Sequence, residues 1–289
     1  MSWINIAKKD FEDSIRSSSL WIVTLIFLVL IAGGTFIVSI LPEAIIGENL
    51  TSDNAIIPLQ GIISLIVPLI SLMIGYMAIA GERDFGTIKT LLGLPNTRFD
   101  VVLGKWIGRS LVAIVPIAIA FIIASIIIAA FYDKFLITNF MIFIFLTILL
   151  AISFLSISIG FSAATDTKTK ALGWAVAVYF FFMFLWDTFI MGIYYVINRT
   201  IPYAAGQQET LPAWFVFLQR ITPNGAFGTL SNELMDLGQF SQYTDISTLI
   251  GTETIPFYLT NYTFLATMLI WITIPPILGY LVFRKTDIT

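Results

Sequence analysis

The sequence predicts an all-α integral membrane protein with six transmembrane helices, and three observations carry this prediction. Residues of the AVILMFWYC set make up 58% of the chain. Only 11% of the residues are charged, whereas ordinary globular proteins have about 25%, so a soluble surface could not be covered. The apolar residues also gather in uncharged runs of more than about 20, which is long enough to cross a hydrocarbon core about 30 Å thick.

Six such runs are the predicted spans. They cover residues 20–41, 55–80, 110–132, 139–164, 171–197 and 261–283. Five of the six spans contain no charged residue. The remaining one, residues 171–197, contains a single charged residue, Asp187. Soluble helices keep a polar face, so this purity favours spans. A carboxylate inside a span is costly. Asp187 is therefore expected to line a substrate path or to hydrogen-bond a neighbouring helix, unless it lies shallow enough to be hydrated.

The basic residues predict the orientation of the spans. Twelve of the 15 Lys and Arg residues lie before the first span, after the last, or in the second and fourth connections. Only Lys134, Arg199 and Arg220 lie on the other side. Because cytoplasmic connections are enriched in Lys and Arg, both termini are predicted to be cytoplasmic in a multi-pass protein of the cell membrane.

Two segments outside the spans have patterns of their own. Residues 1–17 are predicted to form an amphipathic helix in the membrane interface, before a six-span domain over 18–289. The apolar face of this helix would hold Ile4, Ala7, Phe11 and Ile15.

The outer connection 198–260 is 63 residues long and contains a short apolar run over 214–218. It predicts short re-entrant segments between spans five and six, or a loop that caps the outer face.

Two absences exclude much chemistry. The chain has no Cys and no His, so it lacks thiol nucleophiles, thiolate metal sites and the usual general base. One intramembrane Asp leaves no catalytic dyad, and the sequence predicts no catalytic residue, no metal site and no enzyme. A net charge of −3 argues against a nucleic-acid partner.

The cytoplasmic connection 81–109 has the richest local pattern. Apolar residues recur at helical spacing and predict a short amphipathic helix over 84–92. They are Phe85, Ile88, Leu91 and Leu92. Gly93 and Pro95 are suited to end that helix, and Thr97 with Asp100 fits a capping box for the next one. A short helix with an apolar stripe is suited to dock on a partner. Alternatively, it lies on the membrane or on its own bundle.

This connection resembles the first cytoplasmic loop of the permease subunits of type 2 ATP-binding-cassette exporters, especially the nitrous-oxide-reductase maturation subfamily. The matching residues are Gly81-Glu82-Arg83, Gly86-Thr87, Leu91-Leu92, Leu94-Pro95, Arg98, Asp100-Val101-Val102 and Gly104-Lys105. The chain reads Gly-Leu-Pro-Asn-Thr-Arg over 93–98, where relatives more often have Ser-Leu-Pro-Val-Ser-Arg.

The resemblance implies that the helix over 84–92 is a coupling helix, which docks in a groove of a separate cytoplasmic ATPase subunit. The residues assigned to coupling are Glu82, Arg83, Phe85, Gly86, Thr87, Ile88, Lys89, Leu91, Leu92, Pro95 and Arg98. Among them, the four apolar residues would be anchors, and Arg83, Lys89 and Arg98 would be charges at the rim. The resemblance also implies a second permease copy, identical or related, and export of a substrate that the sequence does not identify.

The sequence itself places ATP and Mg²⁺ in another chain. A phosphate-binding loop needs the pattern G-x-x-x-x-G-K-[ST]. The only Gly-Lys pair is Gly104-Lys105, which is followed by Trp106. The main alternative is a six-span secondary carrier or channel that is not driven by ATP. That alternative predicts inverted repeats, several intramembrane ions or a potassium filter, and the sequence contains none of them.

Overall fold

The computed structural model describes residues 3–41, 51–93, 96–200, 202, 210–235, 245–252 and 254–286. Within these ranges every regular element is a helix and no strand occurs. Six helical segments are long and apolar enough to cross a membrane: Leu20–Ser39, Ser52–Asp84, Arg98–Phe131, Ile137–Ala164, Lys168–Asn198 and Asn261–Lys285. The prediction of an all-α chain with six apolar spans is therefore confirmed for the described residues.

Four of the spans consist of α-helix alone, single or broken, and two contain a π-helical turn. The first span comprises α2 (Ser18–Phe27), η1 (Leu28–Ala32) and α3 (Gly33–Ser39). The second to fourth comprise α5 (Ser52–Gly75) with α6 (Ala80–Asp84), α8 (Arg98–Phe131) and α9 (Ile137–Ala164). The fifth comprises α10 (Lys168–Phe180), η2 (Phe181–Leu185) and α11 (Trp186–Asn198), and the sixth is α15 (Asn261–Lys285). Outside them lie α1 (Trp3–Ile15), α7 (Thr87–Gly93), α12 (Ala213–Arg220), α13 (Pro223–Met235), α14 (Ile246–Ile250) and η4 (Phe257–Leu259).

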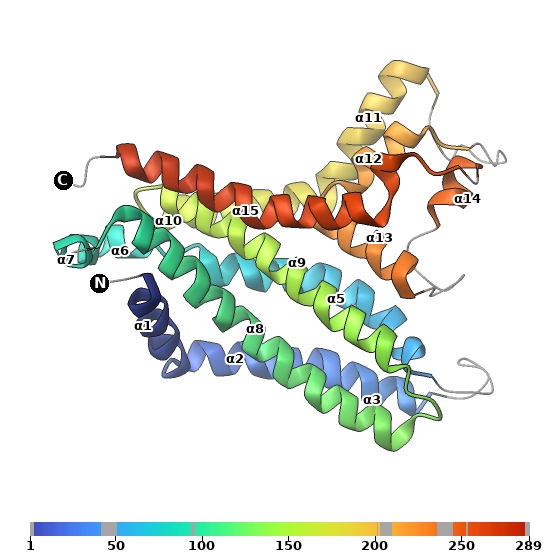
Figure 1. Cartoon of the computed structure of the whole chain (residues 1–289), viewed down its shortest axis with the longest axis horizontal. Helices are drawn as coiled ribbons and strands as arrows, with labels where there is room; N and C mark the ends of the chain where they lie inside the picture. The colour runs from blue at the N-terminus through green and yellow to red at the C-terminus, as the bar shows by residue number, and fades with distance from the viewer. Residues whose placement is uncertain are drawn as a thin grey trace.

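Helix α9 is the centre of the bundle and packs against α5, α8, α10, α13 and α15 (Figure 1). Its approach to α15 is very close, because a Cβ on Gly160 would lie only 2.5 Å from the carbonyl oxygen of Pro275. Small residues allow helix backbones to approach in this way. Towards α5, the buried Ser158 hydroxyl donates to the carbonyl oxygen of Leu72 at 2.6 Å.

Helix α1 rests on α8, where Gly104 and Gly108 make room for it. A Cβ on Gly108 would lie 2.9 Å from the carbonyl oxygen of Ala7, so the two helices pack almost backbone to backbone. Of the predicted apolar face, Ala7 is buried against α8, whereas Ile4 and Ile15 stay exposed. These exposed side chains suit a lipid surface, and the interfacial position of α1 stays a prediction.

The connection between the fifth and sixth spans contains two helices, α12 and α13, that reach back along the bundle. The predicted apolar run 214–218 lies in α12, and α13 is almost wholly buried. Near the turn between them, Trp271 donates to the carbonyl oxygen of Ile221, and Asn224 to that of Ser64, both at 2.9 Å. Trp271 is ten residues into α15, so this turn lies about 15 Å along that helix.

The two ends of the bundle differ (Figure 1). One end holds α1, α6, α7 and the last turns of α15, and the opposite end holds α12, α13 and α14. The connection over residues 81–109 therefore lies beside both ends of the described chain. This arrangement agrees with the predicted topology, in which an even number of spans separates the connection from each end of the chain.

Candidate functional site

The connection between the second and third spans is anchored where it begins. Helix α5 ends at Gly75, and the Ser162 hydroxyl oxygen on α9 accepts hydrogen bonds from the backbone N–H groups of Ile79 and Ala80, both at 2.9 Å. Donors at the first turn of a helix have no partner within that helix. Ser162 supplies an acceptor to both of these N–H groups and so fixes where α6 starts.

Gly86 divides the helix that the sequence predicts over 84–92. Its φ is 75°, in the left-handed region that glycine adopts at little cost. The turn ends α6 at Asp84, and α7 begins at Thr87. The predicted single helix is therefore wrong at its first residues, although α7 ends at Gly93 as expected.

The predicted capping box is confirmed at the start of α8. The backbone N–H of Asp100 donates to the Thr97 hydroxyl at 3.1 Å, and the N–H of Thr97 donates to the Asp100 carboxylate at 3.0 Å. The box satisfies two N–H groups that would otherwise have no partner. From there α8 continues without a break into the third span.

Phe85 and Ile88 lie in opposite environments, contrary to the expectation that both are on one exposed stripe. The Phe85 side chain is 64% exposed, and the Lys168 ammonium lies 4.5 Å from its ring. Ile88 is only 2% exposed and belongs to an apolar cluster with Ile79 and Val101. The turn at Gly86 causes this difference, because it removes the helical register that would have aligned the two side chains.

Two of the three expected rim charges bind within the chain instead. The Arg83 side chain is 8% exposed, pairs with Asp166, and donates to the carbonyl oxygen of Thr165 at 2.9 Å. Arg98 donates to the carbonyl oxygens that end the sixth span, at 2.5, 3.1 and 2.7 Å, namely those of Phe283, Arg284 and Thr286. Such carbonyls have no partner within their own helix. Arg83 and Arg98 therefore brace the connection, whereas Lys89, the third of these charges, is exposed.

A buried group of charges joins three segments that are far apart in the sequence. The Lys105 ammonium on α8 lies 2.8 Å from the Asp10 carboxylate on α1 and 2.9 Å from the Glu82 carboxylate on α6. Arg109 adds a contact of 2.9 Å to the second oxygen of Asp10. The side chains of Lys105 and Asp10 are 9% and 4% exposed. Since an unpaired buried charge costs several kcal/mol, this cluster fixes α1 and α6 on α8.

The remaining residues of the expected set divide into two groups. The Thr87 hydroxyl donates to the Glu82 carboxylate and so ties α7 to α6 across the Gly86 turn. Pro95 and the side chains of Leu91 and Leu92 lie outside the described part of the structure.

Asp187 faces away from the rest of its own chain. It lies in the first turn of α11, directly after η2, and is exposed. Among the described residues, no ion pair or hydrogen bond involves its carboxylate. Of the alternatives that the sequence left open for Asp187, a hydrogen bond to a neighbouring helix is thus not seen within the described residues. The whole fifth span shares this exposure: 11% of its most apolar stretch is buried, against 67% for the fourth span.

The Lys105 cluster, formed by Asp10, Glu82, Lys105 and Arg109, was not predicted from the sequence. The sequence assigned no ion pair to Lys105 or Arg109, and it assigned no role to Asp10. One signal was available: Gly104 and Gly108 flank Lys105 on the same helix and mark a close helix contact. A lysine next to such a contact needs a carboxylate from the partner helix.

The geometry of the connection suits docking on a partner. The described residues contain no group of three potential metal ligands, and the charges around the connection are engaged with one another. Among the described large apolar side chains of the connection, Phe85 and Phe99 are exposed, and Phe85 lies on the braced turn with the Lys168 ammonium 4.5 Å from its ring. An aromatic side chain on a firmly braced turn is typical of the anchors that dominate protein interfaces.

Comparison with known sequences identifies a family and two relatives. Residues 4–288 match the family described as "ABC-2 family transporter protein". Over 127 residues the chain is 35% identical to the "Probable ABC transporter permease protein NosY" of Stutzerimonas stutzeri and 32% identical to the protein of that description from Pseudomonas aeruginosa. Each match covers 43% of this chain and 45% of the relative, so the chain spans less than half the length of these curated relatives.

Proposed function

This chain belongs to the ABC-2 family of transporter proteins, and we propose that it is the permease of an ATP-driven exporter in the cell membrane. ATP and Mg²⁺ would bind to a separate cytoplasmic ATPase subunit, because this sequence has no phosphate-binding loop. Two permease copies, identical or related, would pair against two ATPase chains. The substrate is not identified by any residue described above.

The observation that carries this proposal is the braced, outward-facing Phe85. Helices α6 and α7 are held by Ser162, Arg83 and the Lys105 cluster, so a force applied at Phe85 would reach α1, α8 and α9 directly. In this proposal Phe85 is the anchor in an ATPase groove, Lys89 lies at its rim, and Ile88 holds α7 on the bundle. The two closely braced helices transmit movement of the ATPase to the spans.

The uncovered fifth span supports a second permease copy. Its outward face is rich in exposed aromatic and aliphatic side chains, which are Trp174, Val176, Phe180, Phe184 and Phe189. Asp187 lies among them. An intramembrane carboxylate needs a partner or water, and a second copy could supply either across a shared polar path.

The connection between spans five and six supports the predicted topology. We propose that α12 and α13 are re-entrant segments, which enter from the outer side and turn near the middle of the bilayer. Two hydrogen bonds support this depth. Trp271 of α15 donates to Ile221 at the turn, and Asn224 beside the turn donates to Ser64 of α5. Irregular backbone is tolerated at such a depth only where protein covers it, and α13 is covered by α5, α9 and α15.

Gentle purification tests the proposed function directly. Tagged chain, extracted from its native membrane in a mild detergent, is expected to bring with it an ATP-binding-cassette ATPase chain in about equal amount. Replacing the phosphate-loop lysine of that ATPase should abolish ATP hydrolysis while leaving the complex intact. Purification without any ATPase, together with transport driven by an ion gradient, would instead support the secondary carrier.

Accessibility to a membrane-impermeant thiol reagent tests the orientation. The chain has no Cys, so single replacements need no background removal. Lys89→Cys at the exposed start of α7 is expected to resist the reagent in intact cells and to react after the cells are opened. Thr252→Cys, which is exposed at the opposite end, is expected to react in both. Reversed labelling of the two positions would contradict cytoplasmic termini.

A further inference from the structure

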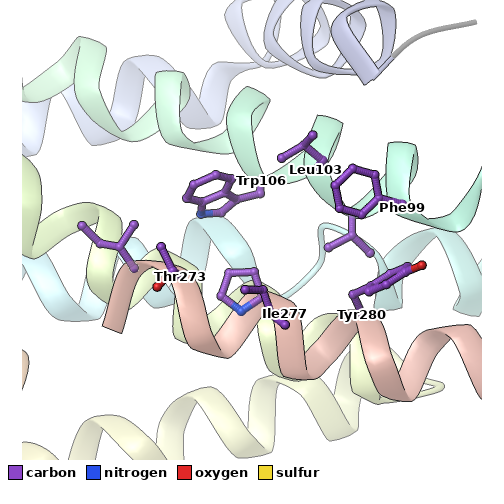
Figure 2. A pocket seen from close by; sticks show the side chains of 9 residues that line it. Phe99, Leu103, Trp106, Thr273, Ile277 and Tyr280 are labelled. Atoms are coloured by element: carbon purple, nitrogen blue, oxygen red, sulfur yellow. The ribbon is translucent and has the colours of Figure 1, made fainter. Parts of the chain in front are cut away.

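A groove runs between α8 and α15, with a cavity volume of about 250 Å³. Figure 2 shows its wall from both helices: Phe99, Leu103 and Trp106 on α8 and Thr273, Ile277 and Tyr280 on α15. The groove extends over about two turns of each helix, from Trp106 and Thr273 to Phe99 and Tyr280, which lie nearer the first residue of α8 and the last residue of α15. It is separate from Phe85 and from the Lys105 cluster.

The chemistry of the groove excludes a polar ligand. Two of its polar side chains are already used: the Trp106 ring N–H donates to the Ser156 hydroxyl, and the Thr273 hydroxyl donates to the carbonyl oxygen of Leu269, both at 2.8 Å. The Tyr280 hydroxyl points away from the other labelled side chains (Figure 2), and the rest of the wall is hydrocarbon or aromatic. A polar ligand would lose its hydration here without gaining hydrogen bonds. The groove therefore suits an aliphatic chain.

The position of the groove also indicates where that chain comes from. Both helices that form it are apolar spans, and Ile277 on its wall is 55% exposed at the outside of the chain. The groove is thus open sideways, toward the hydrocarbon of the bilayer. Its volume of about 250 Å³ suits one acyl chain, whereas pockets for drug-sized molecules usually exceed about 300 Å³.

Positive charge lies just beyond the groove. Arg284 follows Tyr280 by four residues on α15, so the two share one face of the helix, and Lys285 is its neighbour. Both side chains are exposed, and within the described part of the chain neither has an ion pair. Basic residues at the mouth of a groove between spans are a typical site for an anionic lipid headgroup.

We propose that this groove binds one acyl chain of an anionic phospholipid, whose phosphate lies at Arg284 and Lys285. The apolar walls select the chain, and the two cations select the headgroup. A lipid held there would fill the space between the third and sixth spans next to Trp106. The site does not depend on the transported substrate or on an ATPase, so it stands or falls separately from the proposed function.

Native mass spectrometry of the purified full chain tests the acyl part of the proposal. After delipidation, the chain is titrated with phosphatidylglycerol in detergent. We expect one lipid per chain to bind more tightly than the others. Ile277→Trp, which fills the groove, should weaken this binding at least tenfold. Leu278→Trp is the matched control, because Leu278 is 56% exposed but is not part of the groove; it should leave binding unchanged.

The headgroup part has its own control. The double variant Arg284→Gln, Lys285→Gln is expected to lose the preference for phosphatidylglycerol over phosphatidylcholine, by about 30-fold from the charge of two cations near a membrane. The double variant Lys134→Gln, Arg199→Gln removes two exposed cations at the opposite end and should keep it. Equal affinity of the wild-type chain for both lipids would overturn the proposal. Undiminished lipid binding by Ile277→Trp would also overturn it. If Ile277→Trp instead converted a dimer to a monomer, the groove would be assigned to a second copy of the chain, which would overturn the proposal as well.

Discussion

Replacing Lys105 with methionine is expected to lower the melting temperature of the purified chain by about 6–12 °C. The change removes the ammonium that lies 2.8 Å from Asp10 and 2.9 Å from Glu82. Loss of one partner from a buried ion pair costs about 3–5 kcal/mol. We expect about 3 kcal/mol, because Asp10 retains Arg109, and about 2–4 °C follows per kcal/mol for domains of roughly this size. A thermal unfolding scan in detergent measures the shift.

Two controls separate the buried charge from general effects. Lys8→Met removes a lysine whose ion pair with Glu12 is long, at 3.8 Å, and whose side chain is 72% exposed, so the melting temperature should not change measurably. Adding Glu82→Gln to Lys105→Met removes the charge of the carboxylate whose ion pair was with Lys105, and should restore part of the lost stability. If Lys105→Met melts like the wild-type chain, the cluster does not hold α1 and α6 on α8.

The architecture could be predicted from composition because the bilayer leaves few alternatives. An uncharged run of about 20 residues in this chain can only be a span, and backbone groups within a span must be satisfied by a helix. The start of α8 could also be predicted, because the capping residues Thr97 and Asp100 are only three residues apart in the sequence. Local patterns of this kind need no knowledge of the rest of the fold.

The details of the 81–109 connection depend on contacts that no local pattern contains. Helical spacing placed Phe85 and Ile88 on one stripe, but the left-handed Gly86 breaks the register between them. Arg83 and Arg98 read as exposed charges, yet their partners come from the ends of α9 and α15, about 80 and 185 residues away. A long side chain near a helix end has many reachable partners, and only the packed bundle selects one.

The strongest effect on partner binding is expected from Phe85→Ala. Phe85 is the large apolar side chain that the braced turn presents outward, and truncating an interface anchor typically costs about 2 kcal/mol or more. Affinity for the ATPase subunit should therefore fall about 30-fold or more. Surface-immobilised permease titrated with the purified ATPase measures this. The melting temperature of the permease alone should stay near the wild-type value, since Phe85 buries little within its own chain.

Phe257→Ala is the matched control for that measurement. Phe257 is 82% exposed and lies in η4, just before the first residue of α15, the helix whose last turns lie at the end with α6 and α7 (Figure 1), so its loss should leave ATPase affinity unchanged. Ile88→Asp provides the contrast: this residue is 2% exposed inside the chain, and a buried unpaired charge should destabilise the permease itself. Lys89→Ala should weaken binding only slightly, because an exposed ion pair contributes about 0–1 kcal/mol. Wild-type affinity in Phe85→Ala, with the ATPase still bound by the unmodified chain, would show that the contact lies elsewhere on the cytoplasmic end.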